Sequence, residues 1–225
     1  MKRFVVIGLG GFGSWVARLL FQEGYDVIAI DRDGALVDRA VGEVTRAVAG
    51  DATDPALLRE VGAEGAEAAV VSTGDDLASS ILAILALRDV GVDKIYVKVP
   101  NPKAAEALAR FDLTDMVFPE REAAERLVHR LSSTTVLDYI PIGKDFALEE
   151  IAIPDPWVGK SLRELALPAA HGVQVVAIFD VLQGRWETVP LPDQVLKESD
   201  IALVAGSTEV LKKVAGRRVG RQKHL

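Results

Sequence analysis

The chain has 225 residues, of which 49% are hydrophobic and 26% charged, a composition typical of a globular protein. Its net charge of −7 disfavours a nucleic-acid partner, because the phosphates would be repelled. The absence of cysteine excludes disulfides, thiolate metal sites and cysteine nucleophiles.

The N-terminus has a charged pair and then leads directly into a strand, without the apolar stretch and cleavage site of a secretory signal. The longest uninterrupted apolar run, residues 81–87, is too short to cross a bilayer. We therefore expect a cytoplasmic protein that reaches a membrane only through a partner.

The first elements of the chain predict a nucleotide-binding turn. An apolar strand over residues 4–7 precedes a helix whose apolar face begins at Phe12. The loop between them consists of Gly8, Leu9, Gly10, Gly11, Phe12 and Gly13. In such a loop Gly8 permits the tight turn, Gly10 lets a pyrophosphate approach the backbone, and Gly13 lets the helix pack on the strand.

A second strand, residues 27–30, ends in Asp31, and Arg32 follows directly as a further candidate for cofactor binding. A carboxylate at this position accepts hydrogen bonds from both ribose hydroxyls, which favours an adenosine ribose without a 2′-phosphate. A tight strand-to-helix turn followed by a solvated acid is the alternative interpretation of the same residues.

Strands and helices then alternate as far as residue 118. We expect helices over residues 35–41, 55–60, 77–90 and 102–110, and strands over residues 45–49, 68–72, 94–99 and 116–118. Asp54 is a natural N-cap, with Pro55 at the first helical position. The alternation predicts an α/β fold, a Rossmann-like doubly wound parallel sheet with ligands at the carboxyl ends of its strands.

Polar residues follow the third and fourth strands at that edge. Asp51 and the backbone of Ala52 are placed to meet an adenine ring or ribose, although a capped turn explains Asp51 equally well. Thr73 and Gly74 are placed to approach ribose and phosphate, although Gly74 also suits a simple turn.

Two charged residues further along are candidates for the same cleft. Lys98 lies in an otherwise apolar strand, so a phosphate or a carboxylate is expected to neutralise it. Glu120 lies in the first turn of a helix, where the helix dipole alone favours an acid. The alternative is that Glu120 faces the nucleotide and holds a divalent ion such as Mg²⁺ beside its phosphates.

Catalytic equipment is not evident near these residues. The three histidines, His129, His171 and His224, have no metal-ligand spacing, and the sequence contains no nucleophile elbow, carboxylate dyad or Walker lysine. We therefore expect a binding protein rather than an enzyme, with a small NAD-dependent oxidoreductase as the alternative.

The helix predicted over residues 120–131 carries an apolar stripe that the sheet does not need, so we expect it to pack against a partner. We expect the N-terminal domain with this helix to span residues 1–133, a linker residues 134–138, a small α+β domain residues 139–217, and a basic tail residues 218–225. In the small domain we expect strands over residues 146–153, 173–180 and 201–205 and helices over residues 161–167 and 208–214.

Taken together, these segments resemble the RCK family, the regulators of potassium conductance, which includes the cytosolic subunits of Ktr and Trk potassium transporters. The resemblance rests on residues 6–13, 29–31, 50–53, 70–76, 97–98 and 118–120 in the first half, and 159–162, 172–178, 189–190 and 200–204 in the second. It implies an adenine nucleotide in the N-terminal domain, ATP or ADP in Ktr-like members and NAD or NADH in Trk-like ones.

The resemblance also implies a homodimer formed through the helix at residues 120–131, an octameric ring of such pairs, and a membrane-embedded potassium transporter subunit that the ring gates. Gly11 stands where many ATP-responsive members carry an arginine that reaches a neighbouring subunit's nucleotide, so the resemblance leaves the nucleotide open. Cyclic di-AMP, which some relatives bind in the C-terminal domain, is a weaker candidate ligand here, because Asp180 stands where a basic residue is common.

Overall fold

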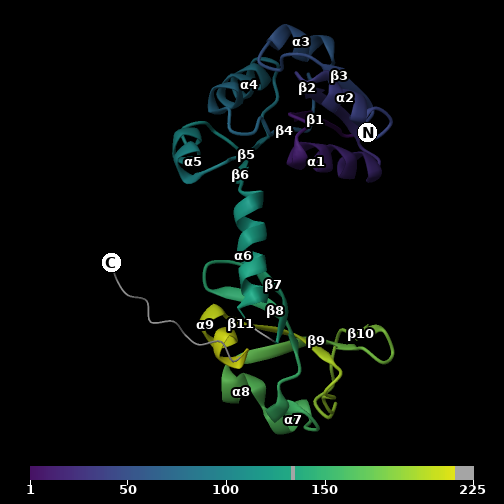
Figure 1. Ribbon diagram of the computed structural model, residues 1–225, viewed down its shortest axis with the longest axis vertical. Coiled ribbons are helices and arrows are strands. Elements are labelled where there is room, and N and C mark those ends of the chain that lie inside the picture. The colour runs from purple at the N-terminus through teal and green to yellow at the C-terminus, as the bar shows by residue number, and fades with distance from the viewer. Residues whose placement is uncertain (133–134, 216–225) are drawn as a thin grey trace. The chain divides into compact units, whose positions relative to one another are not determined.

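The computed structural model describes residues 1–132 and 135–215, so the predicted basic tail over residues 218–225 lies outside the described residues. The chain divides after Glu120 into two compact units (Figure 1). No described helix combines the length and the apolar composition needed to cross a bilayer.

The first unit is built on a six-stranded parallel sheet, which confirms the predicted Rossmann-like, doubly wound fold. The strands lie in the order β3-β2-β1-β4-β5-β6. Their bounds are β1 Arg3–Ile7, β2 Asp26–Asp31, β3 Arg46–Ala49, β4 Ala68–Val71, β5 Ile95–Lys98 and β6 Asp115–Val117.

Helices cover both faces of this sheet because successive residues of its central strands point to opposite sides. Val5 and Ile7 pack into the core beneath three helices, whereas Val6 packs into a second core beneath two others. The first group comprises α3 (Pro55–Glu60), α4 (Leu77–Asp89) and α5 (Pro102–Leu108), and the second comprises α1 (Gly11–Gln22) and α2 (Gly34–Ala40).

The strand order creates the site described below. β1 lies between β2 and β4. From β1 the chain continues to β2 and β3 on one side, and β4, β5 and β6 follow on the other side of β1. In a doubly wound sheet, this reversal opens a crevice outside the carboxyl ends of the two central strands.

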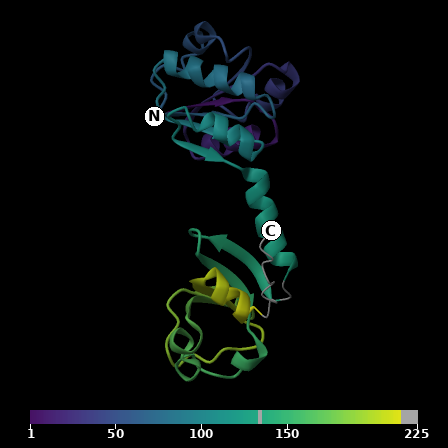
Figure 2. The ribbon, with the colours of Figure 1, turned by 90° about the vertical axis from the view of Figure 1, so that its left-hand side faces the viewer.

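The second unit contains a five-stranded antiparallel sheet in the order β10-β9-β11-β8-β7. Its strands are labelled in Figure 1, and Figure 2 shows the chain turned by 90°. The strands are β7 Val136–Pro141, β8 Phe146–Ala152, β9 Val173–Asp180, β10 Arg185–Glu187 and β11 Ile201–Ser207. Leu167 of α8 (Leu167–His171) and Leu211 of α9 (Thr208–Val214) are buried in its single core, together with Trp157 of the 3-10 helix η1 (Asp155–Trp157).

The structure differs from the sequence prediction in this unit at residues 136–138, at residues 161–167 and in the additional strand β10. Residues 136–138, expected within a linker, begin strand β7, because Val136 and Tyr139 are buried against β8. Residues 161–167, expected to be one helix, end as α7 (Leu162–Leu165), because Ala166 adopts a left-handed conformation with φ of 42°. A second helix, α8, follows with Pro168 in its first turn.

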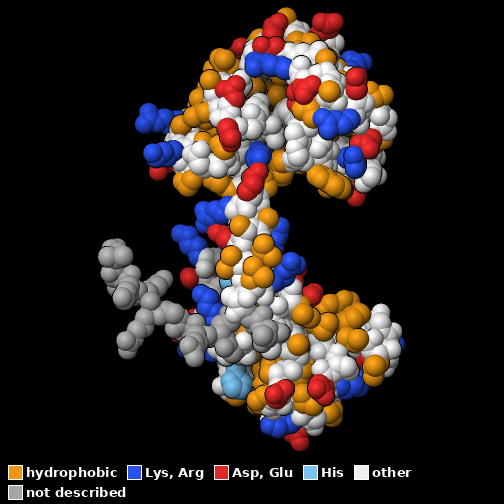
Figure 3. Space-filling view, in the orientation of Figure 1, with side chains coloured by type: hydrophobic (Ala, Val, Ile, Leu, Met, Phe, Trp, Pro, Cys, Tyr) orange, Lys and Arg blue, Asp and Glu red, His pale blue; other side chains and the backbone are white. Residues whose placement is uncertain are grey.

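Helix α6 (Pro119–Leu131) begins at the last residues of the first unit, and none of its residues is buried. Its hydrophobic side chains are visible as an exposed cluster in Figure 3. Leu127, Val128 and Leu131 are 46%, 60% and 77% exposed, so this apolar stripe is uncovered in the single chain.

Candidate functional site

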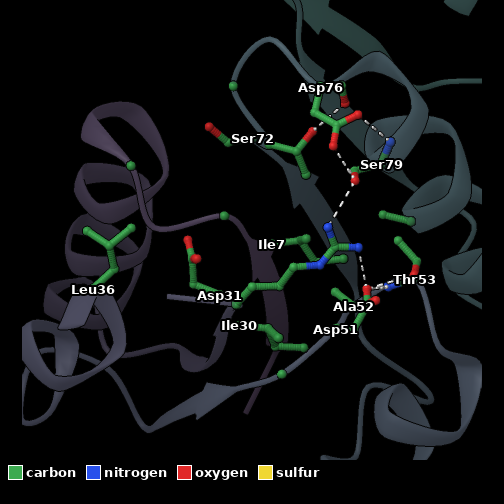
Figure 4. A pocket seen from close by; sticks show the side chains of 17 residues that line it. Ile7, Ile30, Asp31, Leu36, Asp51, Ala52, Thr53, Ser72, Asp76 and Ser79 are labelled. Atoms are coloured by element: carbon green, nitrogen blue, oxygen red, sulfur yellow. Dashed lines mark hydrogen bonds and ion pairs between the residues drawn. The ribbon is translucent and has the colours of Figure 1, made fainter. Parts of the chain in front are cut away.

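A cleft of about 300 Å³ lies at the carboxyl ends of β1, β2, β3 and β4 (Figure 4). A volume of this size suits part of a nucleotide or another small ligand. Most of the residues that the sequence predicts for a nucleotide site line it: Gly8, Gly10, Asp31, Arg32, Asp51, Ala52, Thr73 and Gly74.

The glycines of the first loop have different physical roles. Gly8 has φ of +90°, and a Cβ atom there would lie 2.1 Å from the carbonyl oxygen of Ser72. A Cβ atom on Gly13 would lie 1.9 Å from the carbonyl oxygen of Gly8. The fold itself therefore requires these two glycines, which allow the loop, α1 and the end of β4 to approach closely.

Gly10 is different, because a Cβ atom there would meet no protein atom within 4 Å. Its φ of −64° is also one that any residue adopts. Gly10 nevertheless lines the cleft, so the missing side chain leaves space for a ligand rather than for the protein. Gly11 is equally open, but it does not line the cleft, and neither do Leu9, Phe12 and Gly13.

The N-terminus of α1 adjoins this open space and has no side-chain cap. In contrast, α2, α3, α4 and α5 are each capped by an aspartate or asparagine side chain: Asp33, Asp54, Asp76 and Asn101. The first N–H groups of an α-helix need acceptors from outside the helix, and its dipole favours negative charge there. The start of α1 therefore lacks a side-chain acceptor, and the binding of a phosphate there stays a prediction.

Asp31 is held in place by the backbone on both of its carboxylate oxygens. The N–H of Leu9 donates to Oδ2 at 2.6 Å, and the N–H of Asp33 donates to Oδ1 at 2.8 Å. Each carboxylate oxygen can accept a further hydrogen bond. The carboxylate is thus already oriented toward the cleft and keeps acceptor capacity for two hydroxyl groups.

Arg32 extends across the cleft and joins residues from two other loops. Its guanidinium donates to Oδ1 of Asp51 at 2.8 Å and to the Ser79 hydroxyl at 3.3 Å. The Thr53 hydroxyl also donates to Oδ1 of Asp51, at 2.7 Å. The hydrogen bond from Thr53 and the contact with Arg32 lower the pKa of Asp51 to about 2.

Asp76 completes this network at the start of α4. It accepts hydrogen bonds from the backbone N–H and the hydroxyl of Ser79, at 3.0 Å and 2.6 Å (Figure 4). These bonds from Ser79 lower the pKa of Asp76. The side chains of three aspartates and one arginine therefore line the cleft: Asp31, Asp51, Asp76 and Arg32.

The β4–α4 loop contributes mainly its backbone and shape. The Thr73 hydroxyl lies 2.5 Å from the Ser80 hydroxyl and donates to the carbonyl of Asp76, so it is already engaged within the protein. Gly74 has φ of +68° and open space around it. Both residues line the cleft, Thr73 as a stabiliser of the loop and Gly74 at its surface.

Lys98 and Glu120 do not line the cleft, and they pair with each other instead. The Lys98 ammonium lies 2.5 Å from Oε1 of Glu120, and the Lys98 side chain is 16% exposed. Of the two partners that the sequence leaves open for Lys98, a phosphate or a carboxylate, the structure supplies the carboxylate. The hydrogen bond from Lys98 lowers the pKa of Glu120.

Several residues that line the cleft were not predicted from the sequence as binding residues. They lie at strand ends, in the two later loops and in helices α2 and α4: Ile7, Ile30, Leu36, Gly50, Thr53, Ser72, Asp76, Ser79 and Ala83. Asp76 and Ser79 have a helix-capping pattern in the sequence. Their place in the cleft follows only from the position of β4 beside β1.

Comparison with known proteins identifies the family. Residues 4–119 match the TrkA-N domain, and residues 148–217 match the TrkA-C domain. The chain belongs to the RCK family, among its Ktr and Trk proteins. The resemblance predicted from the sequence is therefore confirmed.

Curated relatives of this RCK protein match it over nearly their whole length. It is 35% identical over 207 residues to the Ktr system potassium uptake protein C of Bacillus subtilis, covering 92% of both chains. It is 30% identical over 212 residues to the Ktr system potassium uptake protein A of Vibrio alginolyticus, covering 93% of this chain and 94% of that protein.

Solved structures share the fold. The GsuK RCK domain matches with a TM-score of 0.65 at 17% identity, over 97% of this chain and 48% of that chain. The NAD(P)-binding domain of an exopolyphosphatase-related protein from Archaeoglobus fulgidus matches with a TM-score of 0.51 at 25% identity, over 58% of this chain and 98% of that one.

Proposed function

We propose that this RCK protein is a nucleotide-binding regulatory subunit that gates a membrane-embedded potassium transporter of the Ktr or Trk type. The observation that carries the proposal is the cleft of the first unit. It combines the oriented carboxylate of Asp31 with the uncapped N-terminus of α1 and the open space at Gly10.

The ligand that this arrangement suits is the adenosine diphosphate part shared by ATP, ADP, NAD and NADH. The ribose hydroxyls would donate to Asp31, and the phosphates would accept from the first N–H groups of α1. Asp51 and Ala52 line the region left for the adenine ring. The similarity to an NAD(P)-binding domain at 25% identity supports a nucleotide in this cleft.

The lining of the cleft supports binding rather than hydride transfer. Its charged residues are Asp31, Arg32, Asp51 and Asp76, and the lining in the described chain includes no histidine, lysine or tyrosine. Those side chains are the usual proton donors and acceptors beside a nicotinamide substrate. We therefore favour a regulatory protein over the small NAD-dependent oxidoreductase.

Magnesium does not fit Glu120 well. Lys98 already occupies Oε1 of this carboxylate, and no group of three acidic or histidine side chains among the described residues is arranged to hold a metal ion. A carboxylate site for a hard divalent ion needs several oxygen ligands. Any Mg²⁺ dependence would therefore arise from the nucleotide phosphates, and no step of the proposal depends on the ion.

Helix α6 supports the proposed assembly. Leu127, Val128 and Leu131 form an exposed apolar stripe, which another copy of the same helix would cover in a two-fold contact. Such a homodimer would be the unit of an octameric ring bound to the inner face of the membrane through the transporter. The relatives named as potassium uptake proteins support that partner.

The energy that gating requires is small for each site. Shifting a two-state assembly from mostly closed to mostly open takes about 5.5 kcal/mol of differential binding. If roughly eight nucleotides share this, each needs to prefer one state by only about 0.7 kcal/mol. One additional hydrogen bond per site is sufficient.

Calorimetry of the purified chain with ATP, ADP, NAD and NADH tests the proposal, with and without Mg²⁺. We expect saturable binding of at least one nucleotide, with one nucleotide per chain. A parallel screen for hydride transfer with small carbonyls and alcohols separates the two functions, because turnover would favour the oxidoreductase. Absence of binding to all four nucleotides would refute the proposal.

A further inference from the structure

The second unit contains a groove that the proposed function does not use. It has a volume of about 420 Å³ and lies between η1, α8 and α9, of which α8 and α9 are labelled in Figure 1. Most of its lining is apolar, including Pro154, Trp157 and Val210. Asp180, which was discussed above in connection with cyclic di-AMP, does not line this groove.

Trp157 forms the most buried part of this groove and leaves one donor unused. The residue is 5% exposed, and its ring centroid lies 6.5 Å from that of His171. Its hydrogen bonds to described residues are made by the backbone, to Pro154 and from Lys160, and none engages the indole N–H. Because no described residue accepts a hydrogen bond from the indole N–H, a ligand oxygen can do so.

Two basic side chains stand at the rim above this apolar floor. His171 ends α8, and Lys213 lies in the last turn of α9. Lys213 binds Oε1 of Glu209 at 2.9 Å across one helical turn, with the two side chains 60% and 71% exposed. An exposed pair of this kind is weak, so Lys213 can exchange its partner for an incoming anion.

We propose that the groove binds a small organic carboxylate with a compact apolar body. The apolar part lies against Trp157, Val210 and Pro154, and the carboxylate reaches Lys213 and His171 at the rim. A bound oxygen atom would also give the indole N–H its acceptor. This site is independent of the nucleotide cleft, because the two lie in different units of the chain.

Fluorine NMR of the full chain labelled with 5-fluorotryptophan tests the site with benzoate and cyclohexanecarboxylate as probes. The chain has three tryptophans, so Trp15→Phe and Trp186→Phe assign the Trp157 resonance by elimination. We expect a saturable shift of that resonance alone at concentrations up to about 10 mM. Benzamide, which has the same ring without the charge, is expected to bind at least about fivefold more weakly.

Matched variants locate the binding. Lys213→Gln should weaken benzoate about fivefold, whereas Lys212→Gln, on the same helix but outside the groove, should leave it unchanged. Glu209→Gln should strengthen binding, because it releases Lys213 from its pair. Ala170→Phe should block the groove, whereas Ala169→Phe, its exposed neighbour outside the lining, should not.

Three results would overturn the proposal. The first is a Trp157 resonance that does not respond to either carboxylate at the highest concentration. The second is equal binding of benzamide, which would remove the role of the basic rim. The third is benzoate binding that Ala170→Phe leaves intact, which would place the ligand elsewhere. Thermal unfolding of each variant confirms that the comparison is made between folded proteins.

Discussion

Gly10→Thr is expected to abolish or strongly weaken nucleotide binding without harming the fold. The backbone at Gly10 has φ of −64°, and a Cβ atom there meets no protein atom within 4 Å. Threonine and glycine are also comparable as N-cap residues of a helix. The free energy of unfolding should therefore change by no more than about 0.5 kcal/mol.

The same substitution is expected to weaken nucleotide binding. The threonine side chain would occupy the space beside the start of α1 that the phosphates need. Filling a close-packed site with extra atoms costs about 1–3 kcal/mol, which corresponds to binding about 5- to 150-fold weaker. Its hydroxyl would also compete for the N–H groups at the start of α1.

Two neighbouring glycines supply the controls. Gly11→Thr also projects into open space but lies outside the lining, so the affinity should stay within about twofold of the wild type. Gly13→Ala would place its Cβ atom 1.9 Å from the Gly8 carbonyl oxygen, so it should destabilise the protein. Calorimetry and thermal unfolding measure both effects. Unchanged nucleotide affinity in a stable Gly10→Thr variant would refute the reasoning.

Three further substitutions have defined outcomes. Asp31→Ala should cost about 1.5–3 kcal/mol of nucleotide binding in calorimetry, and an unchanged affinity would remove this carboxylate from the site. Because the pKa of Asp51 is lowered to about 2, its ionised form stabilises the fold above pH 4, and this contribution disappears as the pH falls toward 2. In Asp51→Asn, the free energy of unfolding should therefore fall less steeply between pH 4 and pH 2. The difference should be about 1 kcal/mol or less, because the carboxylate is half exposed. Identical acid profiles would contradict this. The Leu127→Glu variant should have a lower mass in light scattering than the wild-type oligomer. A monomeric wild type would contradict the proposed dimer.

The first unit was predictable because each local signal agreed with the final fold. Apolar strands, a glycine turn and helix caps such as Asp54 specify the alternation of strand and helix. Strand β7 was harder to predict, because a bulge between Val136 and Asp138 interrupts its period-two pattern of burial. The break at Ala166 was equally hidden, since alanine rarely adopts a left-handed conformation.

The site was predictable where one residue carries its own signal, as Asp31 does at the end of β2. It was not predictable where the contact depends on the order of strands in the sheet. Asp76 reaches the cleft because β4 lies beside β1. Lys98 meets Glu120 because the parallel strands β5 and β6 end side by side, and Glu120 follows β6 by three residues. Neither contact corresponds to a recognisable residue spacing in the sequence.

Potassium uptake in cells tests the central claim most directly. The assay uses a Bacillus subtilis strain lacking the Ktr system potassium uptake protein C, the relative described above. We predict that the wild-type chain restores growth at low potassium concentration, and that Gly10→Thr, produced at the same level, does not. Equal growth with both forms would contradict a regulatory role for the nucleotide cleft, and growth with neither would contradict a role in potassium uptake.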